Sequence, residues 1–95
     1  MSKNSFELMW VSPVIPNEEQ EALVDKYTDL ITDAGGRVAK IDRWGEKVLA
    51  YSINNNTRGV YVLVSFDASR SILPDLDRRL RMDDKILRHM LIQKG

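Results

Sequence analysis

The stretch RVAKIDRWGEKVLAYSINNNTRGVYVLVSF, residues 37–66, predicts a long β-hairpin. Residues 60–66 are dense in β-branched and aromatic side chains, which favour strands. Residues 37–53 are also strand-like, and Gly45 in their middle is typical of a bulge or a sharp bend. Residues 54–59 are polar and contain a glycine, so we expect them to form the loop between the two strands.

The residues before the hairpin predict a strand followed by a helix. Residues 6–12 alternate at a period of two and are apolar on both faces, as in a strand whose second face is also covered. Two prolines end that strand, and the apolar spacing within residues 18–34 matches one face of a helix. Asn17 is the expected N-cap, Gln20 completes a capping box, and Gly35 is the expected left-handed residue at the helix end.

The residues after the hairpin predict a second helix and a last strand. Residues 71–82 carry an apolar residue at every fourth position, Ser71 is the expected cap, and Pro74 falls in the first turn. Residues 86–92 form the fourth strand, so the element order is β-α-β-β-α-β. Right-handed crossovers then place both helices on one face of a four-stranded antiparallel sheet. We expect one α+β domain, a ferredoxin-like sandwich, over residues 1–95.

The composition fits a soluble globular protein of the cytoplasm. Apolar residues make up 43% and charged residues 29% of the 95 residues, which argues against disorder. There is no cysteine, as is compatible with a reducing compartment. No apolar run approaches the ~20 residues needed to cross a bilayer, and the N-terminus lacks a signal-peptide pattern. We therefore expect no membrane association.

The charges cancel overall but are unevenly distributed. The 14 basic and 14 acidic residues give a net charge of zero, which counts against a protein that binds nucleic acid alone. Residues 17–36 contain six acids and one base, whereas residues 78–95 contain six bases and two acids. One side of the molecule could therefore meet an anionic partner, although both segments could equally be solvated helix faces.

No group of residues in the sequence has the pattern of an active site. His89 is the only histidine and lies in an apolar strand, where a histidine is more often packed than catalytic. Asp83 and Asp84 would need further oxygens from elsewhere to hold a metal. The pair Gly35-Gly36 is too short for a phosphate loop, and no serine lies in a nucleophile-elbow pattern. We expect no catalysis, cofactor, metal or small-molecule substrate.

The face of the sheet without helices is the best candidate for a binding surface. An uncovered apolar sheet face exceeds what a monomer usually exposes, so a protein partner or self-association is expected. Sheet-type RNA readers stack bases on aromatic residues of an RNP motif, and residues 60–66 lack the glycine-aromatic lead of that motif. Base stacking on the sheet is therefore not expected, whereas phosphate contacts by arginine and lysine remain open.

Several motifs together carry a resemblance to a known family. In chain order they are Phe6-Glu7 opening the first strand, a proline before the first helix, Gly35-Gly36, WGEKVLAYSI (44–53), GVYVLVSF (59–66) and LRMDDKILRHMLI (80–92). Their order and spacing resemble the bacterial ribosomal small-subunit protein six family over residues 6–93. The sequence departs from the family at Phe6, where a tyrosine is usual, and at Ser52, where a proline is usual.

The resemblance implies a structural component of the small ribosomal subunit. Members of the family pair with ribosomal protein eighteen, and the pair binds the central domain of small-subunit ribosomal RNA during platform assembly. A basic partner would explain how a chain of zero net charge can bind RNA. The alternative function is a ferredoxin-like regulatory or small-ligand-binding domain that self-associates through its sheet.

We choose the candidate site residues by their charge and position, since the resemblance does not settle them. The RNA-binding candidates are Lys3, Phe6, Arg79, Arg81, Lys85, Arg88 and Lys94. The candidates for the protein partner are Arg43, Trp44, Lys47, Met9 and Tyr61. A bend at Gly45 would direct Trp44, Arg43 and Lys47 toward a partner, and tryptophan and arginine are favoured where interfaces concentrate their energy. Alternatively, Trp44 covers the edge of the core.

Overall fold

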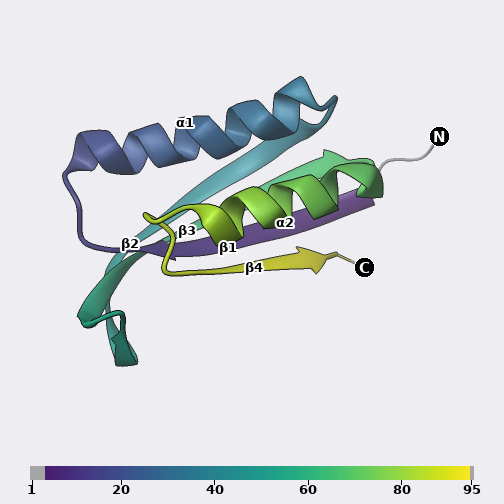
Figure 1. Ribbon diagram of the computed structural model, residues 1–95. Coiled ribbons are helices and arrows are strands. Elements are labelled where there is room, and N and C mark those ends of the chain that lie inside the picture. Colours follow the sequence, from purple (N-terminus) through teal and green to yellow (C-terminus); the bar gives the residue numbers. More distant parts are fainter. Residues whose placement is uncertain (1–3, 95) are drawn as a thin grey trace.

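The protein, in a computed structural model that describes residues 4–94, is a four-stranded antiparallel sheet with two helices on one face (Figure 1). The strands are β1 (Asn4–Ser12), β2 (Arg37–Ile53), β3 (Asn56–Ala68) and β4 (Arg88–Gln93), in the order β2-β3-β1-β4. The helices are α1 (Asn17–Asp33), the short 3-10 helix η1 (Arg70–Ile72) and α2 (Leu73–Met82). The predicted ferredoxin-like α+β sandwich is confirmed.

The core lies between the sheet and the helices. Alternate residues of the two central strands point toward the helices and are almost fully buried: Phe6, Leu8, Trp10, Val62, Val64 and Phe66. The helices add Leu23, Val24, Tyr27, Ile31, Leu76 and Leu80. Burying one such side chain fully contributes about 1.5–3 kcal/mol relative to leaving it exposed. This face of the sheet therefore supplies most of the apolar stabilisation of the fold.

Helix α1 begins without the predicted capping box. Its N-cap is Pro16, and no side chain caps the first turn. Gln20 is buried, accepts a hydrogen bond from Ser12 Oγ at 3.0 Å and donates one to the carbonyl oxygen of Pro13 at 3.2 Å. The capping box at Asn17 was a wrong prediction, because Gln20 joins the helix to the end of β1 instead.

The cap before α2 also lies at a different residue. Ser69, not Ser71, is the cap, and its side chain accepts a hydrogen bond from the amide of Ser71 at the start of η1. Pro74 lies in the first turn of α2, where a missing amide hydrogen costs little. Gly35 after α1 has φ +89°, the left-handed conformation that was predicted.

The β2-β3 hairpin is tighter than predicted and bends at its bulge. Its turn consists of Asn54 and Asn55, both with positive φ, which asparagine tolerates better than most residues. The prediction of a loop over residues 54–59 was therefore too long. Gly45 has φ +83° and lies at a register shift against β3, so the predicted bulge is confirmed. The end of the hairpin projects beyond both helices (Figure 1).

Candidate functional site

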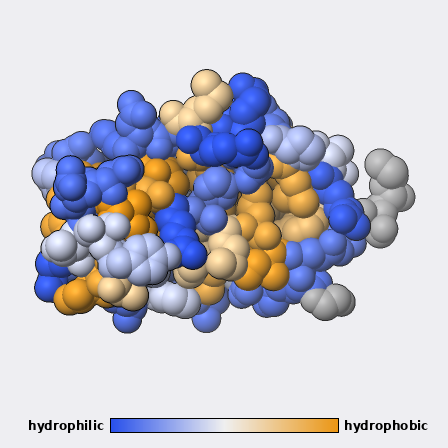
Figure 2. Space-filling view, turned by 60° about the horizontal axis from the view of Figure 1, so that its bottom comes forward, coloured by the Kyte–Doolittle hydropathy of each residue, from blue (hydrophilic) through white to orange (hydrophobic). Residues whose placement is uncertain are grey.

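The face of the sheet that the helices leave uncovered, here the open face, carries an apolar row across its strands. Met9 of β1 pairs with Leu63 of β3 on one side and with Met90 of β4 on the other. Met90 is 42% exposed, and Ile92 on the same side of β4 is also exposed. Seen from the side where β4 lies, apolar side chains gather between polar ones (Figure 2). Such a surface indicates a partner.

The bulge places an aromatic pair on the open face. The rings of Trp44 and Tyr61 stack with centroids 6.3 Å apart and planes at 16°. Tyr61 precedes the buried Val62 on β3, so alternation turns it away from the helices. Trp44 is 47% exposed and is not in the core cluster formed by the described residues. A partner can therefore reach the aromatic pair.

Arg43 lies apart from this surface. Its guanidinium donates two hydrogen bonds to the carboxylate of Glu21 on α1, at 2.8 and 2.7 Å. The bond to Arg43 holds the pKa of Glu21 below its usual value. Because α1 covers the other face of the sheet, the predicted common surface of Arg43 and Trp44 is a wrong expectation. Lys47 is exposed and forms no ion pair with residues 4–94.

Phe6 lies in the core and not on an RNA-binding surface. It is 1% exposed, and its ring centroid lies 5.5 Å from that of Phe66. Alternation along β1 turns Phe6 toward the helices, so the prediction that Phe6 binds RNA is wrong. Lys3 lies outside the described residues.

Most of the candidate RNA-binding cations are paired with carboxylates. The pairs are Arg79–Asp75 at 2.9 Å, Arg81–Asp77, Lys85–Glu19 at 3.0 Å and Lys94–Glu7 at 3.9 Å. These cations are about half exposed or more, and such surface pairs contribute about 0–1 kcal/mol each. Phosphates could therefore replace the carboxylates at small cost. Arg88 forms no ion pair within residues 4–94, and its guanidinium lies 3.5 Å from the Tyr51 hydroxyl.

The titratable groups around α2 join structural elements. His89 Nε2 donates to Asp77 Oδ1 at 2.6 Å, which links β4 to α2 and, with the bond from Arg81, lowers the pKa of Asp77. Asp83 accepts hydrogen bonds from Tyr27 at 2.5 Å and from Lys26 at 2.9 Å. Burial raises the pKa of Asp83, but these bonds outweigh burial and leave the pKa below its usual value. Through these hydrogen bonds, Asp83 links the C-terminal end of α2 to α1.

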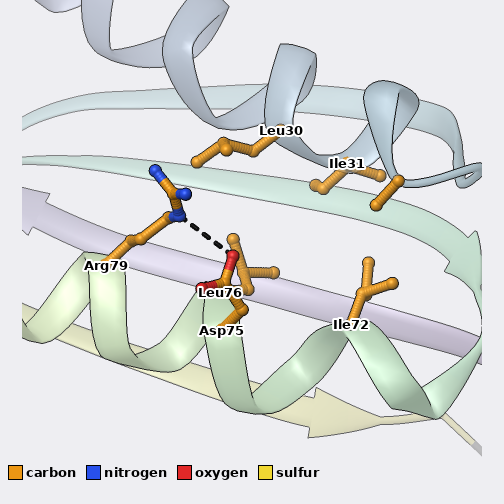
Figure 3. Close-up of a pocket in the computed structure, with 7 residues that line it drawn as sticks. Leu30, Ile31, Ile72, Asp75, Leu76 and Arg79 are labelled. Atoms are coloured by element: carbon orange, nitrogen blue, oxygen red, sulfur yellow. Dashed lines mark hydrogen bonds and ion pairs between the residues drawn. The ribbon is translucent and has the colours of Figure 1, made fainter.

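A groove separates the two helices on the other side of the molecule (Figure 3). It has a volume of about 170 Å³ and is lined by Leu30, Ile31, Ala34, Ile72, Leu76 and the ion pair Asp75–Arg79. Pockets for drug-sized ligands usually begin at about 300 Å³ and hold several converging polar groups. The groove is therefore a poor small-molecule site.

Among residues 4–94, no group of histidine and carboxylate side chains is arranged to hold a metal ion. No helix in the same range is both long and apolar enough to span a membrane.

Sequence reasoning missed Leu63, Met90 and Ile92 as members of the open face. The signal was present in β4, where Arg88, Met90 and Ile92 alternate with His89 and Leu91. The sequence does not reveal which face of the sheet the helices cover, because both faces of β1 are apolar.

Comparison with known proteins identifies the family. The family described as Ribosomal protein S6 matches residues 5–93. The small ribosomal subunit protein bS6 of Desulforamulus reducens is 37% identical over 92 residues, covering 96% of this chain and 97% of the relative. This chain belongs to the ribosomal protein S6 family. The bS6 protein of Caldanaerobacter subterraneus is also 37% identical, over 90 residues, covering 94% of this chain and 95% of that protein.

A solved structure supports the same family assignment. The crystal structure of the 30S ribosomal protein S6 from Thermotoga maritima has a TM-score of 0.91 and 26% identity, covering 97% of this chain and 88% of that one. The resemblance inferred from the sequence motifs is confirmed. As a member of the ribosomal protein S6 family, the chain is a structural protein of the small ribosomal subunit in the cytoplasm.

Proposed function

We propose that this chain binds the central domain of small-subunit ribosomal RNA together with ribosomal protein eighteen, during assembly of the platform. The observation that carries the proposal is the pairing of its cations. The net charge is zero, and Arg79, Arg81, Lys85 and Lys94 each lie beside a carboxylate. Because RNA affinity depends on cations that neutralise phosphates, the chain alone offers little free charge. A basic partner supplies the remainder.

The open face is the surface that we assign to the protein partner. Its aromatic pair, Trp44 and Tyr61, and the methionines Met9 and Met90 are residue types enriched at protein interfaces. Trp44 is the best candidate for a residue that carries much of the binding energy, because tryptophan is over-represented among such residues. Covering this face would remove exposed apolar side chains from water without disturbing the core.

The cations of α2 and of the segment after it are the surface that we assign to RNA. Arg79 and Arg81 lie on α2, and Lys85 follows it. These contacts would position the RNA and would not read its sequence. Their exposed ion pairs with carboxylates can open when phosphates arrive.

The test measures binding of a labelled central-domain RNA fragment, with and without ribosomal protein eighteen, across a salt series. We expect weak binding by the chain alone and tight, salt-dependent binding by the pair. Arg81→Ala should reduce the salt slope by about 0.7–0.9 for one lost phosphate contact. Arg70→Ala is the matched control, because Arg70 is exposed in η1, outside the candidate sites. Tight binding without the partner and without salt dependence would contradict the proposal.

Self-association through the same apolar row is the second candidate. It is favoured by the exposure of Met90 and Ile92 on the open face. Sedimentation of the isolated protein separates the two. We expect a monomer that associates only with the basic partner, whereas a stable homodimer that Met90→Glu dissociates would favour self-association.

A further inference from the structure

The end of the β2-β3 hairpin folds over one corner of the open face and forms a small pocket. Leu49, Tyr51 and Ile53 of β2 line it together with Tyr61 of β3 and Arg88 of β4. We call this the hairpin pocket, and its volume is about 80 Å³. Leu49 is buried, whereas Tyr51 is 66% exposed. The pocket therefore has an apolar side and an accessible aromatic ring.

Close packing at Gly59 holds the hairpin against the sheet. A Cβ atom at Gly59 would lie 2.5 Å from Val11 Cγ1 of β1 and 3.3 Å from Leu49 Cδ2 of β2. The three residues thus meet at a distance that only a glycine permits. This contact places Leu49, which lines the hairpin pocket, close to β1.

Among the described residues, the cations near the hairpin pocket lack the carboxylate partners that the other candidate RNA-binding cations have. Arg88 forms no ion pair within the described part of the chain, and its contact with the Tyr51 hydroxyl is a weak hydrogen bond of 3.5 Å. Lys47, four residues before Tyr51 on the same strand, likewise forms no ion pair with any described residue. This corner of the open face therefore carries positive charge that suits an anionic ligand.

We propose that one unpaired nucleotide of ribosomal RNA binds across the mouth of the hairpin pocket, which is too small to enclose it, with its base on the exposed Tyr51 and a phosphate at Arg88. The inference rests on the proposed RNA binding and specifies one of its contacts. Exposed aromatic rings stack on unpaired bases, and a guanidinium binds phosphate through two parallel hydrogen bonds. This chemistry matches an aromatic ring beside an arginine that has no carboxylate partner.

A side chain of the protein partner fits the hairpin pocket less well. A basic partner would bring more positive charge toward Arg88 and Lys47, and like charges across an interface are costly. The apolar row around Met9 lacks this conflict and remains the surface for the partner. The base is expected on Tyr51 of β2 and not on Tyr61 of β3, because Trp44 already covers one face of the Tyr61 ring. This contact therefore needs no RNP motif in β3.

The experiment uses the full chain with ribosomal protein eighteen and a labelled central-domain RNA fragment. Tyr51→Ala should weaken RNA binding by about 5- to 150-fold, because stacking contributes about 1–3 kcal/mol per base. Tyr51→Phe keeps the ring and should change the affinity by less than about threefold, if stacking carries the contact. Arg88→Gln should weaken binding and reduce the salt slope by about 0.7–0.9.

Two control variants and a second measurement complete the design. Val48→Ala removes a 69% exposed side chain outside the hairpin pocket on the same strand, and Arg70→Gln removes a cation of η1. Neither should change RNA affinity. Affinity for ribosomal protein eighteen alone, measured for every variant, should also stay unchanged. A further measurement needs no variant. When the wild-type pair is cross-linked to RNA that carries 4-thiouridine, the cross-linked peptide should contain Tyr51.

Three results would overturn the inference. In the first, Tyr51→Ala and Arg88→Gln bind RNA like the wild type. In the second, they lose affinity for ribosomal protein eighteen, which would assign the hairpin pocket to a protein side chain. In the third, RNA cross-links map elsewhere while the pair still binds RNA tightly. If the wild-type pair does not bind the RNA, the proposed function itself fails, and that result is distinct from the other three.

Discussion

The two faces of the sheet are made by the same strands, yet they differ in exposure. On β1 the side chain of Leu8 is buried beneath the helices, while the adjacent Met9 is partly exposed on the open face. On β3 the same holds for Val64 and Leu63. One face is closed by α1 and α2, and the other is covered only at one corner by the hairpin. The core that stabilises the fold therefore lies on one side of the sheet, and the surface that we assign to the partner lies on the other.

Replacing Leu8 should have the largest effect on stability. Leu8→Ala leaves a cavity in the core and should lower the free energy of unfolding by about 2–5 kcal/mol. Met9→Ala, one residue away on the open face, should cost less than half as much, because Met9 is already partly exposed. Urea unfolding monitored by circular dichroism measures both. Equal losses would mean that the two faces contribute alike to the fold.

Gly59→Ala should have the next largest effect. The new methyl group would overlap Val11 and crowd Leu49, and overpacking costs about 1–3 kcal/mol. Gly45→Ala is the matched control: it meets nothing within 4 Å, but its positive φ still costs a non-glycine residue about 1 kcal/mol. Unfolding curves for the two variants would contradict this account if Gly45→Ala were the more destabilised.

Asp83→Asn should reduce both stability and its dependence on pH. The folded-state pKa of Asp83 lies below its ordinary value, so its contribution is complete above about pH 4 and is lost as pH falls through the folded pKa. The variant should lose about 1–2 kcal/mol at neutral pH, and its difference from wild type should shrink on acidification. Thermal unfolding from pH 6 to pH 3 measures this, with Asp84→Asn as the control. A constant difference across that range would contradict it.

Arg43→Gln should have the smallest effect. Its ion pair with Glu21 is about half exposed on both sides, and such pairs contribute about 0–1 kcal/mol. Affinity for ribosomal protein eighteen should not change, because Arg43 contacts α1 and not the open face. Calorimetric titration of the partner checks this. A large loss of partner affinity would place the interface on the helix side.

The sequence predicted the fold well, because its signals are local. Alternation defined the strands, apolar spacing defined the helices, and Gly45 marked the bulge. The side of β1 that meets the helices could not be predicted, since both of its faces are apolar. For that reason the sequence did not reveal that Phe6 lies in the core. A bulge interrupts the alternation of side chains along a strand, so the sequence does not show which face each residue near Gly45 occupies. Arg43 was grouped with Trp44 for this reason.

The candidate site was less predictable, because it depends on contacts between distant residues. Lys85 pairs with Glu19, 66 positions earlier, and Arg88 meets Tyr51 only because the hairpin folds over the sheet. Charge along the sequence could show that residues 78–95 are basic. It could not show which of those cations already have a carboxylate beside them.

Titration of ribosomal protein eighteen into wild-type protein and into Met90→Lys tests the central claim most directly. Met90 is 42% exposed on the open face, so the variant should fold with an unchanged unfolding midpoint. If the basic partner covers this face, a positive charge there should weaken binding by at least about 30-fold. Equal affinities of the two proteins for the partner would contradict the assignment of the open face to partner binding.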